Sequence, residues 1–550
     1  MARKGSRKVR TGCFTCKVRK VKCDETKPAC ARCSASGRKC DGYPAPLSTE
    51  LRPFLPKSPS EFPGAMSQAE SRAIQFFCEM AGPNLPGATD PFFWTHLVMQ
   101  FSRFEPAVKH SVIAISSLYE DVIVARARGE SHLRGQRLRD NSLALGHYNA
   151  AIKQLLVMEN QGLVLLVCLL FVCVELLQSN RDMALRHCAH GTAIMGSSDA
   201  LSYHWVKQWV LPLFRRLNAL KYFFGDDRSD LPDLRVSEYP IPALFFNFNE
   251  AESMIDDVFN QAFQLVRRGD VYRAGHKRHE DPPPDLLREQ DRIVHLLDLW
   301  YTMFVNLDAR CVAKKNEIKG PGRLFALTRY RTSKVWASMA FTKTEMGYDS
   351  QHEEFRIMVE DMSRAADERM QSDSDRNRNN FEFEMGLIAP IMFIVMKCRY
   401  LDLRIEALRC LAVLAAPREA LWERDGMYSL ARRIIEIEHG VGLDETGQIP
   451  PGVKPSCSGL PPEDMRVAHF VTEISEASGQ DFYGHEVRGR KAVFVMRATD
   501  DTVRLRPDVL PDYPVALPAW SAKCAHETVL SGADVEEYER SVSSHAWIKG

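Results

Sequence analysis

The sequence predicts a small N-terminal domain held together by metal, then a large and mostly helical domain with a β-hairpin near its C-terminus. Three observations lead to this fold class. Six cysteines lie at repeated spacings within residues 1–40. Between about residues 66 and 450, apolar residues recur at three- and four-residue steps, the period of an α-helix. Near residue 495 apolar and polar residues alternate instead, which is typical of paired strands.

The six cysteines form two units of identical spacing. In each unit two residues separate the first pair and six residues precede the third cysteine, and the second unit repeats the first at an offset of 17 residues. A tetrahedral zinc ion takes four ligands, and the first histidine of the chain is as distant as His96. Six thiolates therefore satisfy two zinc ions only if two of them bridge both metals. The predicted ligands are Cys13, Cys16, Cys23, Cys30, Cys33 and Cys40.

Other interpretations of the cysteines fit less well. A disulfide framework is disfavoured because the N-terminus, MARKGSRKVR, has no apolar run of the kind that directs secretion. A single four-cysteine site would leave two thiols unused and would ignore the repeat. A metal-storage peptide would have denser cysteines and no reason to collect arginine. Because residues 1–40 contain few apolar side chains, we expect the metal to hold this fold.

The residues between the cysteines carry a resemblance. The pattern includes Arg10-Thr11-Gly12-Cys13, Arg19-Lys20, Lys22-Cys23-Asp24-Glu25, Pro28, Gly37-Arg38 and Gly42-Tyr43. It resembles the binuclear zinc cluster domain of fungal transcription regulators, over about forty residues. The resemblance implies that the first and fourth cysteines, Cys13 and Cys30, bridge the zinc ions. Cys16 and Cys23 would then complete one site, and Cys33 and Cys40 the other.

Basic residues are concentrated around these cysteines. Residues 1–40 contain thirteen lysines or arginines and two acidic residues, a formal charge of +11 in a chain whose total is +1. Such a run alone is usually a solvated face or a nuclear import signal. Combined with the cysteine cluster, it predicts binding to double-stranded DNA and a location in the nucleus.

The basic residues divide into two predicted roles. The segment after Cys16 reads as a short helix that could present its end to the major groove, where a lysine or arginine can donate to guanine. By resemblance, Lys20 is the base-reading lysine, Arg19 and Lys22 lie beside it, and the DNA site is built of CGG triplets. Phosphate contacts are expected from Lys17, Lys27, Arg38 and Lys39.

The expected domain boundaries follow changes in composition. The basic arm and cysteine cluster occupy residues 1–43, and a proline-rich spacer occupies residues 44–65. No heptad repeat follows Tyr43, so there is no sign of a coiled coil to pair two chains. Either the protein reads one triplet as a monomer, or the large domain forms a homodimer.

Residues 66–450 are predicted to be helical. One apolar stripe contains Val108, Val112, Ile115, Tyr119 and Val122, and another contains Leu286, Ile293, Leu297, Trp300, Phe304 and Leu307 after a proline run. The most apolar run, residues 163–174, is twelve residues long, whereas a membrane span needs about twenty. It is therefore expected to be a buried helix with Cys168 and Cys173 as apolar fillers, and no membrane contact is expected.

The apolar spacing of this region continues the resemblance. The spacing around Phe93-Trp94 and residues 105–108, with His110 and Glu120, resembles the helical regulatory region of filamentous-fungal zinc cluster factors. The resemblance implies a domain that controls the DNA-binding head, sometimes through a small-molecule effector. Residues 451–550 differ in composition, and residues 491–497 and 503–506 alternate around Asp500-Asp501 as in a β-hairpin.

Catalytic patterns are weak. His187 and His190 share a helical face but lack a third metal ligand at a readable spacing, so we expect ordinary surface or core histidines. Glu175 is expected at a helix end, facing solvent or pairing with an arginine. No G-x-S-x-G or G-x-G-x-x-G sequence occurs, so no enzyme is expected. The expected function is zinc-dependent transcription regulation of RNA polymerase II genes. The alternative is a metabolite-binding or enzymatic helical domain that the zinc head localises to DNA.

Overall fold

The computed structural model of the chain describes two compact units, Met1–Pro56 and Lys57–Gly550. The described residues are 13, 15, 16, 19, 21–24, 26, 29–40, 67–128, 141–197, 199–224, 242–313, 318, 320–371, 380–457, 459–481, 484–511 and 528–544. The predicted spacer, residues 44–65, lies outside them. The predicted fold class is confirmed, because a cysteine cluster is followed by a mainly helical unit with a small antiparallel sheet near the C-terminus.

Cysteines take the place of an apolar core in the small unit. Cys13, Cys16, Cys30 and Cys33 are buried against one another, and Val21 packs on them. The helix α2 (Ala31–Ala35) begins directly after Cys30. With so little apolar surface to bury, this unit depends on its cysteines and their ligand for stability.

The first part of the large unit is a bundle around one apolar core, the first core. Both predicted properties of its most apolar segment are confirmed, because α9 is buried along nearly its whole length and includes Cys168 and Cys173. All five residues of the predicted stripe in α6 are buried as well. The elements are α3 (Gln68–Phe76), η2 (Phe77–Ala81), α4 (Gly82–Asn84), η3 (Phe93–Leu97), α5 (Val98–Ser102), α6 (Pro106–Ala127), α8 (Ser142–Leu155), α9 (Gln161–Leu177), α10 (Arg181–Ser197), η4 (Asp199–Ser202), η5 (Val206–Val210) and α11 (Leu211–Phe224).

Glu175 near the end of α9 corrects the sequence interpretation. Its side chain is buried, with 4% of its surface exposed, and it pairs with no arginine among the residues that the structure describes. The Tyr148 hydroxyl donates to one carboxylate oxygen at 2.6 Å, and Asn180 Nδ2 donates to the other at 2.8 Å. Burial raises the pKa of this carboxyl group. The expectation was wrong because the donor on α8 comes from a distant part of the chain.

Three further helices of the large unit build its second core. The predicted stripe of α13 is buried, and the helix begins at Pro284, directly after the proline run. Trp300 lies at the centre of this core and donates its indole N–H to the Ala251 carbonyl oxygen at 2.8 Å. The helices of this core are α12 (Phe248–Arg273), α13 (Pro284–Ala313) and α14 (Gly320–Met339). The elements that follow pack in the first core: η6 (Glu345–Gln351), α15 (His352–Gln371), α16 (Ile388–Lys397), α17 (Leu401–Leu414) and α18 (Arg424–His439).

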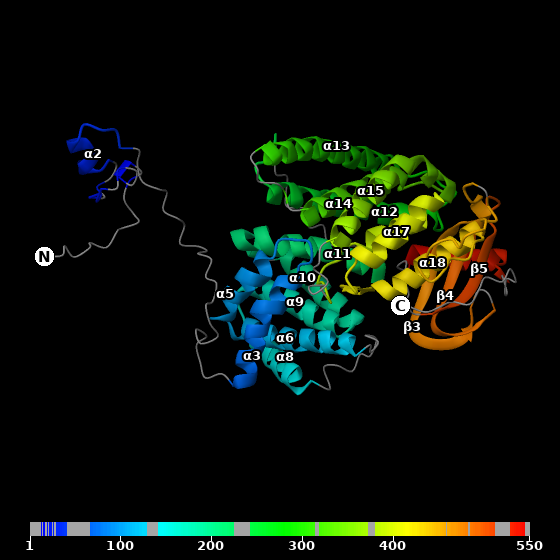
Figure 1. Cartoon of the computed structure of the whole chain (residues 1–550), viewed down its shortest axis with the longest axis horizontal. Helices are drawn as coiled ribbons and strands as arrows, with labels where there is room; N and C mark the ends of the chain where they lie inside the picture. Colours follow the sequence, from blue (N-terminus) through cyan, green and yellow to red (C-terminus); the bar gives the residue numbers. More distant parts are fainter. Residues whose placement is uncertain are drawn as a thin grey trace. The chain divides into compact units, whose positions relative to one another are not determined.

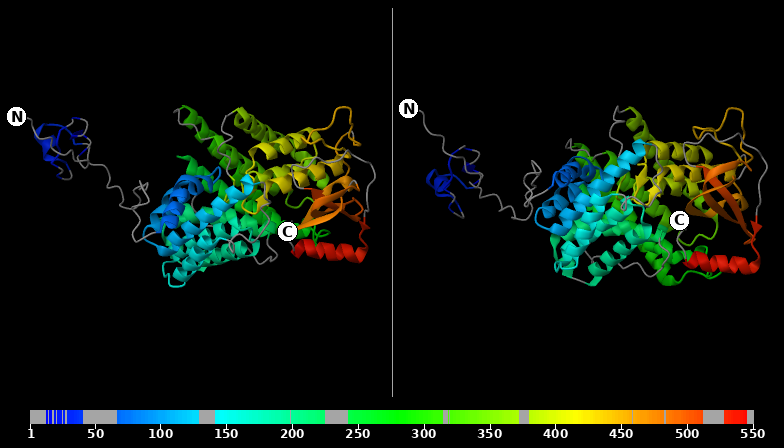
Figure 2. Two further views of the ribbon diagram at one scale, coloured as in Figure 1. Left: turned by 60° about the horizontal axis from the view of Figure 1, so that its bottom comes forward. Right: turned by 90° about the horizontal axis from the view of Figure 1, so that it is seen from below.

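The C-terminal region contains a four-stranded antiparallel sheet in the order β3-β4-β5-β6. The predicted hairpin is confirmed as β4 (Glu486–Arg497) and β5 (Val503–Pro511), which pair with Arg497 opposite Val503. The sheet is larger than predicted, because β3 (Val467–Gln480) and β6 (Thr528–Val529) extend it. Helix α18 packs on β5, and α19 (Gly532–Ser544), red in Figure 2, lies against α12. The short strands β1 (Arg418–Glu419) and β2 (Trp422–Glu423) precede α18, with the 3₁₀ turn η8 (Glu463–Met465) before β3.

No helix in the described part of the chain combines the length and apolar character needed to cross a membrane. Among the described helices, the longest, α13, is amphipathic, and the most apolar, α9, has 17 residues. The apolar faces of both are buried in the cores of the large unit.

Candidate metal centre

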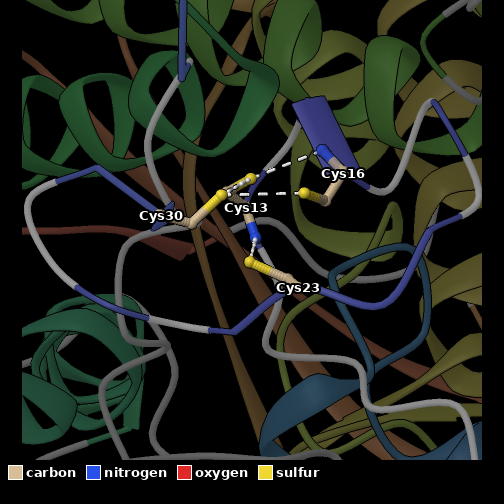
Figure 3. Close-up of side chains that lie close together, drawn as sticks. All are labelled: Cys13, Cys16, Cys23 and Cys30. Atoms are coloured by element: carbon tan, nitrogen blue, oxygen red, sulfur yellow. Dashed lines mark hydrogen bonds between the residues drawn. The ribbon is translucent and has the colours of Figure 1, made fainter. Parts of the chain in front are cut away.

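The six cysteines form two overlapping groups of four. One group is Cys13, Cys16, Cys23 and Cys30, and the other is Cys13, Cys30, Cys33 and Cys40. Within each group all sulfur atoms lie within 4.8 Å of one another. The two shared sulfur atoms, those of Cys13 and Cys30, are 3.6 Å apart. Figure 3 shows the first group, with the four side chains directed toward a common centre.

The sequence repeat produces a repeat in the local hydrogen bonds. In the first cysteine repeat the Cys16 backbone N–H donates to Cys13 Sγ at 3.3 Å. In the second repeat the Cys33 backbone N–H donates to Cys30 Sγ, also at 3.3 Å. The Sγ atom of the third cysteine in each repeat accepts the backbone N–H of the first. Cys13 donates to Cys23 and Cys30 donates to Cys40, both at 3.5 Å. Cys13 and Cys30 are thus equivalent positions, and each lies where the two groups overlap.

Asp24 connects the two cysteine repeats within the small unit, a role that the sequence interpretation missed. Its carboxylate accepts the backbone N–H groups of Ala31 at 2.9 Å and Arg32 at 3.0 Å, the free donors at the start of α2. The Thr26 hydroxyl donates to the same carboxylate, and these bonds hold the pKa of Asp24 well below its usual range. The signal in the sequence is a short acidic side chain, Asp24, followed by Thr26. Both lie a few residues before Cys30, the cysteine at which a helix begins.

Electrostatics favour a bound cation at the cysteines. Burial raises the pKa of the Cys13 thiol to about 12 and also raises those of Cys16 and Cys30. A divalent ion reverses this effect, because a coordinating thiol loses its proton. Six thiolates with no competing carboxylate or imidazole form a donor set that suits zinc. The residues present therefore fit two zinc ions.

Four of the seven predicted DNA-contact residues can be placed. Lys22, Arg38 and Lys39 are exposed on the small unit. Arg19 is partly buried and donates to Ser36 Oγ at 3.1 Å, so it also links the first cysteine repeat to the second. The other three, Lys17, Lys20 and Lys27, lie outside the described residues, and the DNA contacts stay predictions.

The histidine pair of α10 gives no metal site in the described part of the chain. The two cysteine groups are the only sets of three or more possible ligands that converge there. His187 lies 3.3 Å from the Tyr148 hydroxyl through Nε2, and burial lowers its pKa to about 4. His190 is exposed. Both are the ordinary histidines that the sequence interpretation favoured.

Comparisons with known proteins agree with this geometry. The model of the fungal Zn(2)-Cys(6) binuclear cluster domain matches residues 11–50. The chain is 29% identical over 303 residues to the aspercryptin biosynthesis cluster-specific transcription regulator atnN of Emericella nidulans, covering 47% of each protein. It is 28% identical over 200 residues to the transcription regulator lscL of Purpureocillium lilacinum, covering 32% of this chain and 47% of lscL.

A third relative matches through the cysteine region. It is the transcriptional regulatory protein moc3 of Schizosaccharomyces pombe, 55% identical over 38 residues, 7% of this chain and 8% of moc3. The chain thus spans about half the length, or less, of these curated relatives. No solved structure matches it. Residues 11–50 are therefore a fungal Zn(2)-Cys(6) binuclear cluster domain with two zinc ions as its cofactor, in a chain related to fungal transcription regulators.

Proposed function

We propose that this protein is a zinc-dependent, sequence-specific DNA-binding transcription regulator that acts in the nucleus on RNA polymerase II genes. The observation that carries the proposal is the pair of overlapping cysteine groups within a segment of formal charge +11. The relatives named as transcription regulators support it. No enzymatic activity is proposed.

The arrangement of the metal follows from the two groups. One zinc ion would be held by Cys13, Cys16, Cys23 and Cys30, and the other by the second group, so the thiolates of Cys13 and Cys30 would serve both ions. The zinc supplies no reaction chemistry and acts as the core of the domain. Six thiolates and two divalent ions leave a net charge of about −2, which the surrounding lysines and arginines offset.

The chain's own basic residues read the DNA. Lys20 donates to guanine in the major groove of a CGG triplet. The exposed Lys22, Arg38 and Lys39 support it at the surface. Contacts to phosphate set the affinity and its dependence on salt, while the contact to guanine sets the sequence preference. The helical unit regulates this head.

Selection from a pool of randomised duplexes tests the proposal with the full chain. The pool is sorted with zinc present and after chelation, at two salt concentrations. We expect enrichment of CGG-type sites that disappears on chelation, and the recovered spacing distinguishes a monomer from a homodimer. Binding that is indifferent to sequence and to chelation would contradict the proposal, since a basic arm on phosphate would explain it.

A further inference from the structure

A mostly apolar cavity lies inside the large unit. Its volume is about 160 Å³, and its walls come from α11, α12, α14, η6, α16, β2 and β3. Helices α11 and α16 belong to the first core, and α12 and α14 contribute to the second, so the cavity lies where the two cores meet. An engineered apolar cavity of about 150 Å³ is known to accept benzene. This space therefore accommodates a molecule built around one ring.

Aromatic and thioether side chains form most of the wall. The aromatic contribution includes Phe259, Phe263 and Trp336, with ring centroids of Phe263 and Trp336 6.0 Å apart. Methionines from two segments, including Met339 and Met392, complete it. Thioether side chains are flexible and polarizable, and they pack favourably against aromatic rings. Such a wall adapts to a flat apolar molecule more readily than a wall of branched aliphatic side chains would.

Buried donors in the wall lack partners. Thr328 is 5% exposed and Tyr348 is 6% exposed, and neither hydroxyl makes a hydrogen bond among the residues that the structure describes, although neither oxygen atom is completely buried. The indole N–H of Trp422, whose side chain also lines the cavity, is buried without an acceptor in the same part of the chain. Buried polar groups are nearly always hydrogen-bonded. Their orphaned donors therefore favour an occupant that brings an acceptor.

Charges around the cavity exclude a positive occupant. Within the described ranges no aspartate or glutamate lines it, whereas Arg216, Arg273, Arg329 and Lys397 do. Each cation is already paired with a carboxylate outside the lining, for example Lys397 with Glu345 at 2.8 Å. An ammonium group inside would face these cations without a carboxylate of its own.

We propose that this cavity binds a small ring-containing molecule, neutral or anionic, that carries an acceptor oxygen for the free donors of the wall. The molecule contacts both cores of the large unit, so its binding stabilises their present packing. The proposal goes beyond the DNA-reading function and does not depend on it, because the site lies within the large unit alone.

Three probes with a shared skeleton test the chemistry of the site. Acetophenone has a carbonyl acceptor, ethylbenzene has none, and 1-phenylethylamine carries an ammonium group. Titration calorimetry on the zinc-loaded full chain is expected to show one acetophenone site, about tenfold tighter than ethylbenzene, the ratio that one net hydrogen bond gives. No binding is expected for 1-phenylethylamine. Failure of acetophenone to bind, or equal binding of all three probes, would overturn the proposal.

Matched variants locate the site. Ala389→Leu adds volume at the cavity wall, and Ala412→Leu makes the same change at a partly buried helix position outside the lining. We expect the first to abolish acetophenone binding and the second to retain it. Thr328→Val keeps the shape of the side chain and is expected to weaken acetophenone without affecting ethylbenzene.

Two results would show that acetophenone binds elsewhere. The first is equal acetophenone affinity in Ala389→Leu and Ala412→Leu. The second is that neither Thr328→Val nor Tyr348→Phe changes the affinity for acetophenone or ethylbenzene. DNA selection on the same preparations is read separately. Loss of CGG preference with intact acetophenone binding would reject the DNA-reading function only, and the reverse result would reject the cavity only.

Discussion

At the scale of single residues, base reading by Lys20 is separable from zinc binding. Lys20 is not a predicted metal ligand, so Lys20→Ala is expected to keep two zinc ions per chain. One specific base contact contributes about 1–3 kcal/mol of discrimination. Affinity for a CGG duplex should therefore fall by that amount relative to a scrambled duplex, as measured by fluorescence anisotropy at fixed salt.

The matched control for this variant is Lys153→Ala, an exposed lysine on α8 in the large unit. It removes the same charge from the chain and should leave binding to both duplexes unchanged. If Lys20→Ala weakens the CGG and scrambled duplexes equally, Lys20 contacts phosphate and the guanine contact belongs to another residue.

A buried carboxylate at Glu438 should be among the most costly residues to change. Its side chain is fully buried, pairs with Arg404 at 2.7 Å and Arg399 at 3.3 Å, and accepts the Val467 N–H at 2.6 Å. Glu438→Gln leaves two buried guanidinium groups without this partner, which should lower the free energy of unfolding by about 3–5 kcal/mol. Denaturant unfolding followed by fluorescence measures it.

The exposed pair of Arg356 and Glu360 on α15 supplies the control for Glu438. Solvent screens this pair, so Glu360→Gln should not change the unfolding midpoint measurably. Equal effects of the two substitutions would show that the buried ion pairs of the large unit do not stabilise it.

The same carboxylate predicts how this stabilisation depends on pH. Desolvation opposes the charged form of Glu438, but the two guanidinium groups outweigh it and keep its pKa lowered. A lowered pKa gives stability that is complete above the ordinary glutamate pKa of about 4.3 and is lost as the pH falls below it. The stability difference between wild type and Glu438→Gln should stay constant from pH 7 to about 5 and shrink below about 4. A difference that grew on acidification would contradict this sign.

At the scale of secondary-structure elements, helix α2 depends on Asp24. Its carboxylate accepts two backbone N–H groups at the start of the helix, next to Cys30 and Cys33. Asp24→Ala removes these acceptors and should weaken zinc binding, while Asp24→Asn keeps one carbonyl oxygen and should weaken it less. Competition with a chromophoric chelator measures both. Equal zinc affinities for wild type and Asp24→Ala would show that the metal alone orders this helix.

Elements differed in how far the sequence could predict them. The stripes of α6 and α13, the burial of α9 and the β4–β5 hairpin follow from local periodicity, and the structure has them. Strand β3 and the partners of Glu175 depend on segments distant in sequence, which periodicity does not reveal. The cysteine groups were predictable because their spacing repeats, whereas the cavity is built from seven elements and leaves no pattern in any of them.

At the scale of the whole molecule, the two units have cores of different kinds. Cysteines make up the buried group of the small unit, while apolar side chains fill the two cores of the large unit. The converging metal-ligand groups in the described residues all lie in the small unit. Removal of zinc should therefore unfold the small unit and leave the stability of the large unit unchanged.

Tryptophan fluorescence can observe the large unit by itself. The chain has eight tryptophans, and the first is Trp94, so every one lies beyond the small unit. After chelation we expect DNA binding to be lost while the thermal midpoint of the fluorescence transition stays within about 1 °C, a change that corresponds to about 1 kcal/mol in a unit of this size. Returning zinc should restore DNA binding. A midpoint that falls by many degrees on chelation and recovers with zinc would mean that the metal also stabilises the helical unit, so that the two units unfold together.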